Sequence, residues 1–384
     1  MIICVRGLGG NVATTLAIGT SLLSDNPGED RTLGSVLAAP AWRKAALPPL
    51  SAISFRGWDI RGDSVISRAA EAGILKADEL ALVQRSLGHL VPRPAPVRPH
   101  DVSDPSVRSD QALPVSALAA CAYYLDELEK LRAEDADIVA INLASTESIN
   151  RAARDVTTVD EFYALVDGDS PVISGGIAFA LACIEARVPY CDFTPDLTLE
   201  CPALLQLARD QRMPVAGKDG NTGQTFLKLV LAEAIVKRNL GIIGWYSANV
   251  LGNLDGRVLT LPGHRETKLE DKLTALDSIV PYEFHHVVDI AFEPSRGDHK
   301  EAWDTVNLKG WLGRRVSLRV NWCASDSILA APLTLDICRL LHLSSARGES
   351  GVQTQLSPFF KHPIGHTRTS LVQEYLDLER HYGI

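Results

Sequence analysis

Short apolar runs alternate with segments of helical spacing through the first part of the chain. Ile2–Arg6 is an apolar run that predicts a β-strand, and Asn11–Leu23 has the small and aliphatic spacing of an α-helix. A second strand is expected at Ala52–Phe55. Leu118–Leu131 predicts a helix and Asp137–Leu143 predicts a further strand. This order is typical of α/β proteins that are built on an open parallel sheet.

The middle of the chain continues this pattern with more polar turns. Residues 91–105 contain five prolines and are expected to form a long surface connection. The glycine-rich turn Ser174–Gly176 precedes an expected helix at Ile177–Ala186, and a loop at Tyr190–Pro195 is expected to follow a short strand. Another helix is predicted at Phe226–Val236, so the α/β character persists well beyond the first strands.

The composition is that of a soluble globular protein. Hydrophobic residues make up 46% and charged residues 22% of the 384 residues. This length suggests two or three domains, or one α/β domain with a large insertion. The net charge of -9 provides no global basic field for binding nucleic acid. Apolar stretches such as Ile177–Ile184 are much shorter than the roughly 18 residues that cross a bilayer, so we expect neither a nucleic-acid nor a membrane partner.

The cysteines and the first residues of the chain indicate a reducing compartment. The seven cysteines are scattered and include no C-x-x-C pair, which argues against a disulfide framework and a structural zinc site. Met1–Gly7 lacks the basic region and the long apolar core of a signal peptide. We therefore expect a cytoplasmic protein without a bound metal.

A glycine-rich segment links the first expected strand to the first helix. Gly7–Asn11 would let a pyrophosphate approach the backbone at a helix amino terminus, where unpaired N–H groups favour an anion. The third glycine of the dinucleotide motif is replaced by Val12, so a simple glycine turn is the alternative. Asp59, just after the second expected strand, is the candidate ligand of an adenosine ribose.

Two further polar segments lie where an open parallel sheet binds its ligands. Ser145 and Thr146 directly follow an expected strand, and ligands bind at the carboxyl ends of such strands. Polar residues also crowd the start of the helix predicted at 226–236, namely Lys218, Asp219, Asn221, Thr222, Gln224 and Thr225. A helix amino terminus in these surroundings suits an anionic, hydroxyl-rich ligand.

Several sequence blocks, in order along most of the chain, match those of a known family. They are Gly7–Asn11 with Thr14-Thr15, Gly57–Ile60, Gly217–Thr225, Asn249–Gly256, Gly297–Lys300, Asp326–Pro332 and Phe359–Pro363. On these residues the chain resembles the myo-inositol-1-phosphate synthases, also called inositol-3-phosphate synthases. Its length and the form of Gly217–Thr225 are most similar to the compact bacterial type.

The resemblance implies an α/β fold in which an NAD-binding Rossmann domain is interrupted by an α+β catalytic and oligomerisation domain. We place the interruption at residues 223–325, which leaves residues 1–222 and 326–384 to the NAD-binding domain. A homotetramer that pairs through the sheet of the inserted domain is also implied. His285–Phe292 and Arg315–Trp322 are suitable strands for that sheet.

The activity implied by the resemblance is that of an NAD-dependent carbocyclase. C5 of a hexose 6-phosphate is oxidised, a C6 proton is removed, the ring closes by aldol addition, and the ketone is reduced again. Oxidation is required because a C6 proton is acidic only beside a carbonyl group. One closed pocket must therefore hold the nicotinamide, the phosphate and two oxyanions.

The resemblance also implies the catalytic residues. They are three lysines and three aspartates: Lys268, Lys272, Lys361, Asp219, Asp255 and Asp326. Lysines donate to oxyanions, and a neighbouring carboxylate keeps each amine charged and oriented. The i, i+4 spacing of Lys268 and Lys272 places both on one face of a helix, and two solvated lysines on an acidic surface helix are the alternative.

Cofactor and phosphate ligands follow from the same match. The expected NAD ligands are Gly7, Gly9, Gly10, Asn11, Asp59, Ser145, Thr146, Asp219, Asn253 and Asp255. The residues expected at the substrate phosphate are Thr222, Gly223, Gln224 and Thr225. For Thr222 a simple helix cap is the alternative.

One departure from the family leaves the sugar open. The longer eukaryotic members have a lysine in the strand before Gly297, whereas Asp289–Phe292 supplies none. The leading substrate is glucose 6-phosphate, which gives 1L-myo-inositol 1-phosphate. The competing substrate is fructose 6-phosphate, whose carbonyl at C2 would close a five-membered ring. A non-catalytic NAD-binding protein is a hypothesis of a different class, and a simple dehydrogenase is a third.

The histidines offer no replacement for that lysine. His285 and His286 are adjacent in an expected strand and point to opposite faces. His362 and His366 have the spacing of a helical metal pair, but the intervening Pro363 argues against a helix and hence against zinc.

Overall fold

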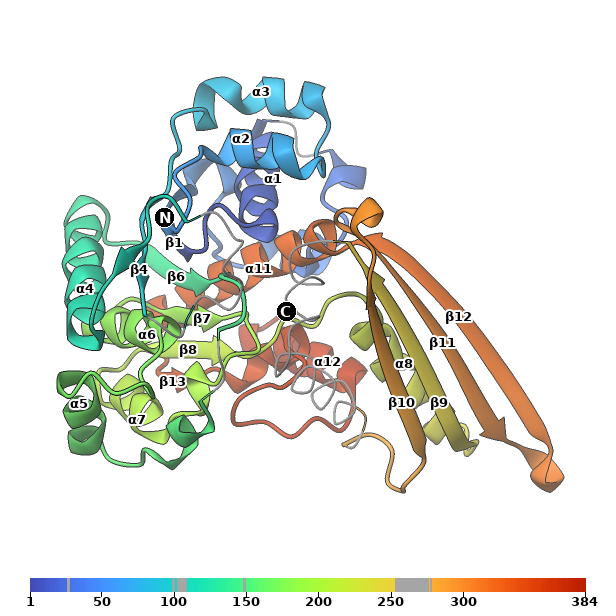
Figure 1. Ribbon diagram of the computed structural model, residues 1–384. Coiled ribbons are helices and arrows are strands. Elements are labelled where there is room, and N and C mark those ends of the chain that lie inside the picture. The colour runs from blue at the N-terminus through green and yellow to red at the C-terminus, as the bar shows by residue number, and fades with distance from the viewer. Residues whose placement is uncertain (26–27, 99–100, 102–108, 148–149, 253–275, 277) are drawn as a thin grey trace.

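The computed structural model describes residues 1–25, 28–98, 101, 109–147, 150–252, 276 and 278–384. A seven-stranded sheet of parallel strands forms one part of the molecule, in the order β13-β8-β7-β6-β1-β2-β3 (Figure 1). Its strands are β1 (Ile2–Arg6), β2 (Ser54–Asp59), β3 (Arg93–Pro94), β6 (Ile138–Asn142), β7 (Tyr190–Asp192), β8 (Pro214–Gly217) and β13 (Gly351–Val352). The chain order reverses beside β1, and such a reversal opens a crevice for a ligand at the carboxyl ends of the strands.

Helices cover both faces of this sheet, so its central strands are buried at every position and mostly apolar. All five residues of β1 are buried, with Ile2 and Cys4 in one core cluster and Ile3 and Val5 in another. The first cluster packs against α4 (Ala117–Glu134), α5 (Val159–Asp167), α6 (Gly175–Glu185) and α7 (Pro202–Asp210). The second packs against α1 (Asn11–Asp25), α2 (Val65–Ala72), α3 (Ala77–Leu87), α11 (Asp326–Ala346) and α12 (Leu371–Tyr382). This arrangement is a Rossmann-like core.

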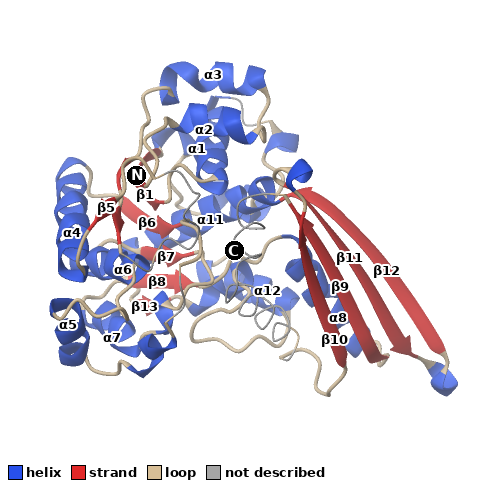
Figure 2. Ribbon diagram, in the orientation of Figure 1, coloured by secondary structure: helices blue, strands red, loops and turns tan. Residues whose placement is uncertain are grey.

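A four-stranded sheet extends to one side of the large sheet (Figures 1 and 2). It has the order β10-β9-β11-β12, with β9 (Gly241–Leu251), β10 (His285–Phe292), β11 (His299–Lys309) and β12 (Arg315–Ser325). β9 and β10 are parallel and the other pairs are antiparallel. α8 (Gly223–Lys237) covers one face through Leu229 and Ala232, while Tyr246 and Trp303 are exposed on the other.

α11 connects the two sheets. It starts directly after β12, where the Ser325 hydroxyl accepts a hydrogen bond from the N–H of Ile328, and it continues under the large sheet. By length and composition alone α11 could cross a membrane, but 67% of its most apolar window is buried inside the protein. The helix is therefore a core helix of this fold.

Three predicted segments differ in detail. Tyr190–Asp192 is strand β7 rather than the start of a loop, because its side chains are buried between the helical layers. The proline-rich segment contributes β3 and also β4 (Pro96–Val97), which pairs with β5 (Leu113–Pro114). The helix expected from Phe226 begins three residues earlier, at Gly223. The remaining bounds agree with the predicted elements to within a few residues.

Candidate active site

The glycine-rich loop after β1 forms one wall of a cavity of about 650 Å³. Gly7 has a φ of +89°, and a Cβ there would lie 2.7 Å from the backbone of Ala144. The N–H of Gly9 donates to Asp59 Oδ2 at 2.8 Å, and a Cβ on Gly9 would meet that carboxylate at 3.0 Å. Glycine is therefore required at position 7 and leaves room for the Asp59 carboxylate at position 9, and the bare backbone facing the cavity fits the close approach of a pyrophosphate.

Asp59 joins the loop to the segment that follows β2. Its Oδ1 accepts the N–H of Arg61 at 3.1 Å, while its Oδ2 is held by Gly9. Burial raises the pKa of Asp59, and the two backbone N–H groups oppose that rise. The carboxylate is thus fixed at the place expected for an adenosine ribose.

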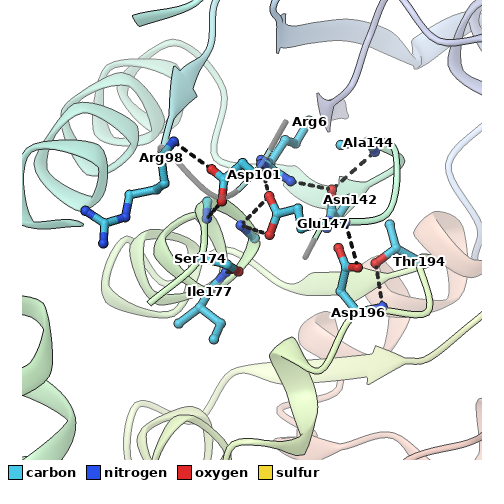
Figure 3. A network of polar contacts seen from close by, with 12 residues as sticks. Arg6, Arg98, Asp101, Asn142, Ala144, Glu147, Ser174, Ile177, Thr194 and Asp196 are labelled. Carbon is cyan, nitrogen blue, oxygen red and sulfur yellow. Dashed lines mark hydrogen bonds and ion pairs between the residues drawn. The ribbon is translucent and has the colours of Figure 1, made fainter. Parts of the chain in front are cut away.

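A buried polar network holds the neighbouring loops in place (Figure 3). The Arg6 guanidinium pairs with Glu147 and donates to Asn142 Oδ1 at 3.3 Å. Glu147 accepts the N–H of Gly176, at the start of α6, at 3.0 Å. Burial and the neighbouring Glu147 carboxylate raise the pKa of Asp101 to about 6, although Arg6 lowers it. This network fixes the loop that carries Ser145 and Thr146, which line the cavity.

Two lysine–aspartate pairs lie at the other end of the same cavity. Lys361 Nζ donates to Asp219 Oδ1 at 2.7 Å, and Lys300 Nζ lies 3.2 Å from Asp326 Oδ2. The Lys361 and Asp219 backbones are also linked, because the N–H of Lys361 donates to the carbonyl oxygen of Asp219. All four side chains line the cavity. Each pair presents the cavity with an ammonium group that an aspartate orients, which suits a negatively charged oxygen.

The amino terminus of α8 faces this end of the cavity through Thr222, Gln224 and Thr225. Thr222 occupies the cap position but makes no side-chain capping hydrogen bond, so the simple cap does not explain its hydroxyl. Gly223 is not part of the cavity wall; it has a φ of +49° and its added Cβ would lie 3.6 Å from Asp326. The unpaired N–H groups of this helix start suit a phosphate.

A buried carboxylate, that of Asp304, orients the side chain of Gln224. Gln224 Nε2 donates to Asp304 Oδ2 at 2.8 Å, and Asp304 Oδ1 accepts from Trp245 Nε1 at 2.7 Å and Ser247 Oγ at 2.6 Å. Lys228 lies beside this group, with Nζ 3.1 Å from Ser247 Oγ. Burial lowers the pKa of Lys228 to about 8, although Asp304 opposes this. Asp304 and Lys228 were not found from the sequence because nothing in their local pattern distinguishes them from other residues of an amphipathic strand or helix.

A lysine lines the cavity although the strand Asp289–Phe292 supplies none. Ala291 on β10 is exposed and is not part of the cavity wall, whereas Lys300 at the start of β11 lines the cavity. The block Gly297–Lys300 already contained this residue among those that carry the family resemblance. This block is the sequence feature by which Lys300 could have been predicted as a site residue.

Four of the predicted site residues are not described by the structure. Asn253, Asp255, Lys268 and Lys272 lie outside the described residues. The described members of the predicted cofactor, catalytic and phosphate sets, except Gly223, line one cavity.

The histidines take other roles. His286 Nε2 lies 2.8 Å from Lys228 Nζ, and His366 Nε2 lies 3.2 Å from Glu374 Oε1. Within the part of the chain that the structure describes, no three His, Cys, Asp or Glu side chains form a group that could hold a metal ion.

Comparisons of the sequence with known proteins point to one family. The family model described as myo-inositol-1-phosphate synthase, an NAD-binding family, matches residues 1–378. Inositol-3-phosphate synthase 1 of Bacteroides thetaiotaomicron is 33% identical over 391 residues, which cover 94% of this chain and 89% of that protein.

Solved structures show the same fold. The crystal structure of inositol-3-phosphate synthase from Caenorhabditis elegans superposes with a TM-score of 0.90 at 21% identity, covering 99% of this chain and 84% of that one. A myo-inositol-1-phosphate synthase-related protein from Thermotoga maritima gives a TM-score of 0.81 at 19% identity, covering 100% and 98% of the two chains. The chain therefore belongs to the myo-inositol-1-phosphate synthase family, a family of isomerase-type enzymes that use NAD.

Proposed function

We propose that this enzyme is a carbocyclase that converts glucose 6-phosphate to 1L-myo-inositol 1-phosphate with recycled NAD. The observation that carries the proposal is that the dinucleotide loop and two lysine–aspartate pairs line one cavity. A cyclisation that combines redox and aldol steps needs both kinds of groups within reach of one sugar. The relative named inositol-3-phosphate synthase 1 supports the choice of sugar and product.

The nucleotide half of the cavity would hold the cofactor. Bound NAD would accept a hydride from the sugar and return it in the last step. Gly7, Gly9, Gly10 and Asn11 would bind its pyrophosphate, and Asp59 would bind the adenosine ribose. Ser145 and Thr146, held by the Arg6 network, would form the wall toward the sugar.

The start of α8 would bind the phosphate of the sugar. Thr222 and Thr225 present hydroxyl groups there, and Gln224 presents an amide whose direction Asp304 fixes. Binding the phosphate at a rigid helix amino terminus would position C5 and C6 relative to the lysines.

Lys361 and Lys300 would stabilise the negative oxygens that the reaction creates. Removal of a C6 proton places negative charge on the C5 oxygen, and attack of C6 on the C1 carbonyl places it on the C1 oxygen. Two ammonium groups, each held by an aspartate, match two such oxygens. Asp219 and Asp326 keep the amines charged and aimed into the cavity.

The deciding experiment incubates the purified protein with glucose 6-phosphate or fructose 6-phosphate and determines the product ring by NMR. We expect a six-membered cyclitol phosphate from glucose 6-phosphate and no accumulation of NADH. A five-membered ring from fructose 6-phosphate alone would establish the alternative cyclase. Bound NAD without any cyclised product would indicate a non-catalytic binder, and steady release of NADH a dehydrogenase.

We further propose that the enzyme is a cytoplasmic homotetramer assembled through the open face of the small sheet. Tyr246 on β9, Val287 on β10 and Trp303 on β11 are exposed on that face. Their register brings them close together, because Tyr246 pairs with Val287 and the neighbouring Ala248 pairs with Trp303. Exposed aromatic and aliphatic side chains gathered on one face are typical of protein interfaces.

A further inference from the structure

Four charged side chains meet at the ribose end of the cavity. Asp59 ends β2, Arg61 follows it, Arg68 and Glu71 lie on α2, and all four line the cavity. Both oxygens of Asp59 accept backbone N–H groups, so its carboxylate is fixed beside the glycine loop. The place expected for an adenosine ribose is therefore bordered by two guanidinium groups and two carboxylates.

Glu71 engages both arginines. Its Oε2 and Oε1 lie 3.3 and 3.4 Å from one guanidinium nitrogen of Arg61, and its Oε2 also pairs with Arg68. Arg68 is anchored to the loop as well, because its Nε donates to the carbonyl oxygen of Gly9 at 3.2 Å. The arginine side chains are only 18% and 10% exposed, whereas Glu71 is 63% exposed. Glu71 thus covers two oriented guanidinium groups from the solvent side.

An arginine near the end of the second strand is what allows a Rossmann site to accept the 2′-phosphate of NADP. A guanidinium group binds a phosphate through parallel N–H bonds, and this chain has the Arg61 and Arg68 side chains in the same cavity wall as Asp59. We propose that Glu71 is a specificity-determining residue that engages Arg61 and Arg68 and thereby makes the site select NAD over NADP. A 2′-phosphate would have to displace Glu71 while also facing Asp59.

The charge of Glu71 supports this role. Partial burial raises the pKa of Glu71, but the Arg68 and Arg61 guanidinium groups outweigh it, so that the pKa is lowered overall. The carboxylate therefore remains ionised at neutral pH and repels a second anion. This inference rests on nucleotide binding by the family and not on which sugar is cyclised.

The test compares NAD and NADP binding by calorimetry after bound nucleotide has been removed. For Glu71→Gln we expect NADP to bind about 10- to 100-fold more tightly, as one or two charge-assisted hydrogen bonds would give. NAD affinity should stay within about threefold, since the ribose hydroxyls do not need a free guanidinium group. Glu129→Gln, at an exposed position of α4 that is not part of the cavity wall, removes the same charge and should change neither affinity.

A second variant tests whether the arginines cause the gain in NADP affinity. Adding Arg61→Ala to Glu71→Gln should abolish most of the improved NADP binding, and raising the salt concentration should weaken NADP binding more than NAD binding. Thermal unfolding checks that each variant is folded. Unchanged NADP affinity in folded Glu71→Gln, or an equal change for both nucleotides, would overturn the proposal while leaving the proposed cyclisation untouched.

Discussion

Lys361 Nζ lies 2.7 Å from Asp219 Oδ1, although 142 residues separate the two along the chain. The contact joins the carboxyl-terminal segment to the loop after β8, and it is strengthened by a backbone bond between the same residues. Asp219 has a φ of +57°, and it lines the cavity. Both partners are thus held by the fold before any substrate arrives.

Lys361→Ala should lower cyclisation by about 100- to 1,000-fold, the usual effect of removing one oxyanion donor. Product formation, bound NAD and thermal unfolding should be measured on the same sample. NAD binding should persist, because only the sugar end of the cavity loses a charge. Lys309→Ala, an exposed lysine at the end of β11, is the matched control. Near-normal cyclisation by Lys361→Ala would remove this residue from the reaction.

Gly9→Ala should weaken NAD binding by about 10- to 100-fold, because the new methyl group would press on the Asp59 carboxylate. The affinity is best measured by fluorescence or calorimetric titration. Gly19→Ala provides the control in the helix that follows the loop, since a Cβ at Gly19 meets nothing within 4 Å. That control should bind NAD normally and be slightly more stable, by roughly 1 kcal/mol. Equal NAD affinity in both variants would contradict the proposed loop.

Asp304→Asn should raise the KM for the sugar phosphate more than it lowers kcat. The amide keeps one acceptor oxygen and replaces the other by a donor, which would oppose either Gln224 or the pair Trp245 and Ser247, so that the fixed direction of Gln224 is weakened. NAD affinity should not change. A loss of stability of about 1–3 kcal/mol is expected for the disturbed buried group. Gln224→Leu should reproduce the effect on KM with a smaller loss of stability, and an unaltered KM in both variants would exclude this arrangement from substrate binding.

Asp336, on α11, should give the folding stability a defined pH dependence. Burial raises its pKa from 3.8 to about 7, although Ser35 and the N–H groups of Val36 and Leu37 lower it. Between these values the folded protein keeps a proton that the unfolded chain has lost. The free energy of unfolding should therefore fall as the pH rises through this interval.

Urea unfolding at several pH values checks this expectation. Asp336→Asn does not titrate, so its free energy of unfolding should lack this decrease toward pH 7. Like the protonated carboxyl group, its amide offers one acceptor and one donor to Ser35 and Val36. Asp167→Asn, at an exposed position of α5, should retain the pH dependence of the original protein. Parallel pH profiles for the original and Asp336→Asn proteins would refute the assignment.

Trp303→Glu should weaken association of the subunits by at least about 100-fold, as for a central aromatic residue of an interface. Trp303 is 44% exposed on the open face of the small sheet. Light scattering on dilution series measures the change. Trp311→Glu is the control, because it alters an exposed tryptophan in the hairpin between β11 and β12. It should leave the association of the subunits unchanged. A tetramer that survives Trp303→Glu would place the interface elsewhere.

The local elements were predictable because their signals are local. Ile2–Arg6 is apolar at nearly every position and ends in glycines, and this pattern specifies a buried strand and a tight loop without knowledge of any partner. The polar start of α8 was predictable for the same reason, since Thr222–Thr225 lie next to one another along the chain. These segments needed no long-range information.

The remaining part of the site depends on pairings between distant segments. The pairing of Lys300 with Asp326 becomes recognisable only when β11 brings the two together, and Asp304 only when Gln224 packs over it. Glu71 resembles any helical surface glutamate until Arg61 and Arg68 are seen to turn toward it. Periodicity reports which face of an element is buried, but it does not report which residue lies opposite.

The position of α11 has a consequence for the order of folding during synthesis. Ile337 and Leu341 of this helix share a core cluster with Ile3 and Val5 of β1, and Ser35 is bonded to Asp336 across 301 residues. While the ribosome has produced only the first strands, one face of the large sheet lacks this cover and exposes apolar side chains to water. Contacts between such distant segments slow folding, and the nascent sheet is open to aggregation until α11 emerges. A truncated protein that ends at residue 222 should therefore be insoluble despite containing the whole glycine loop.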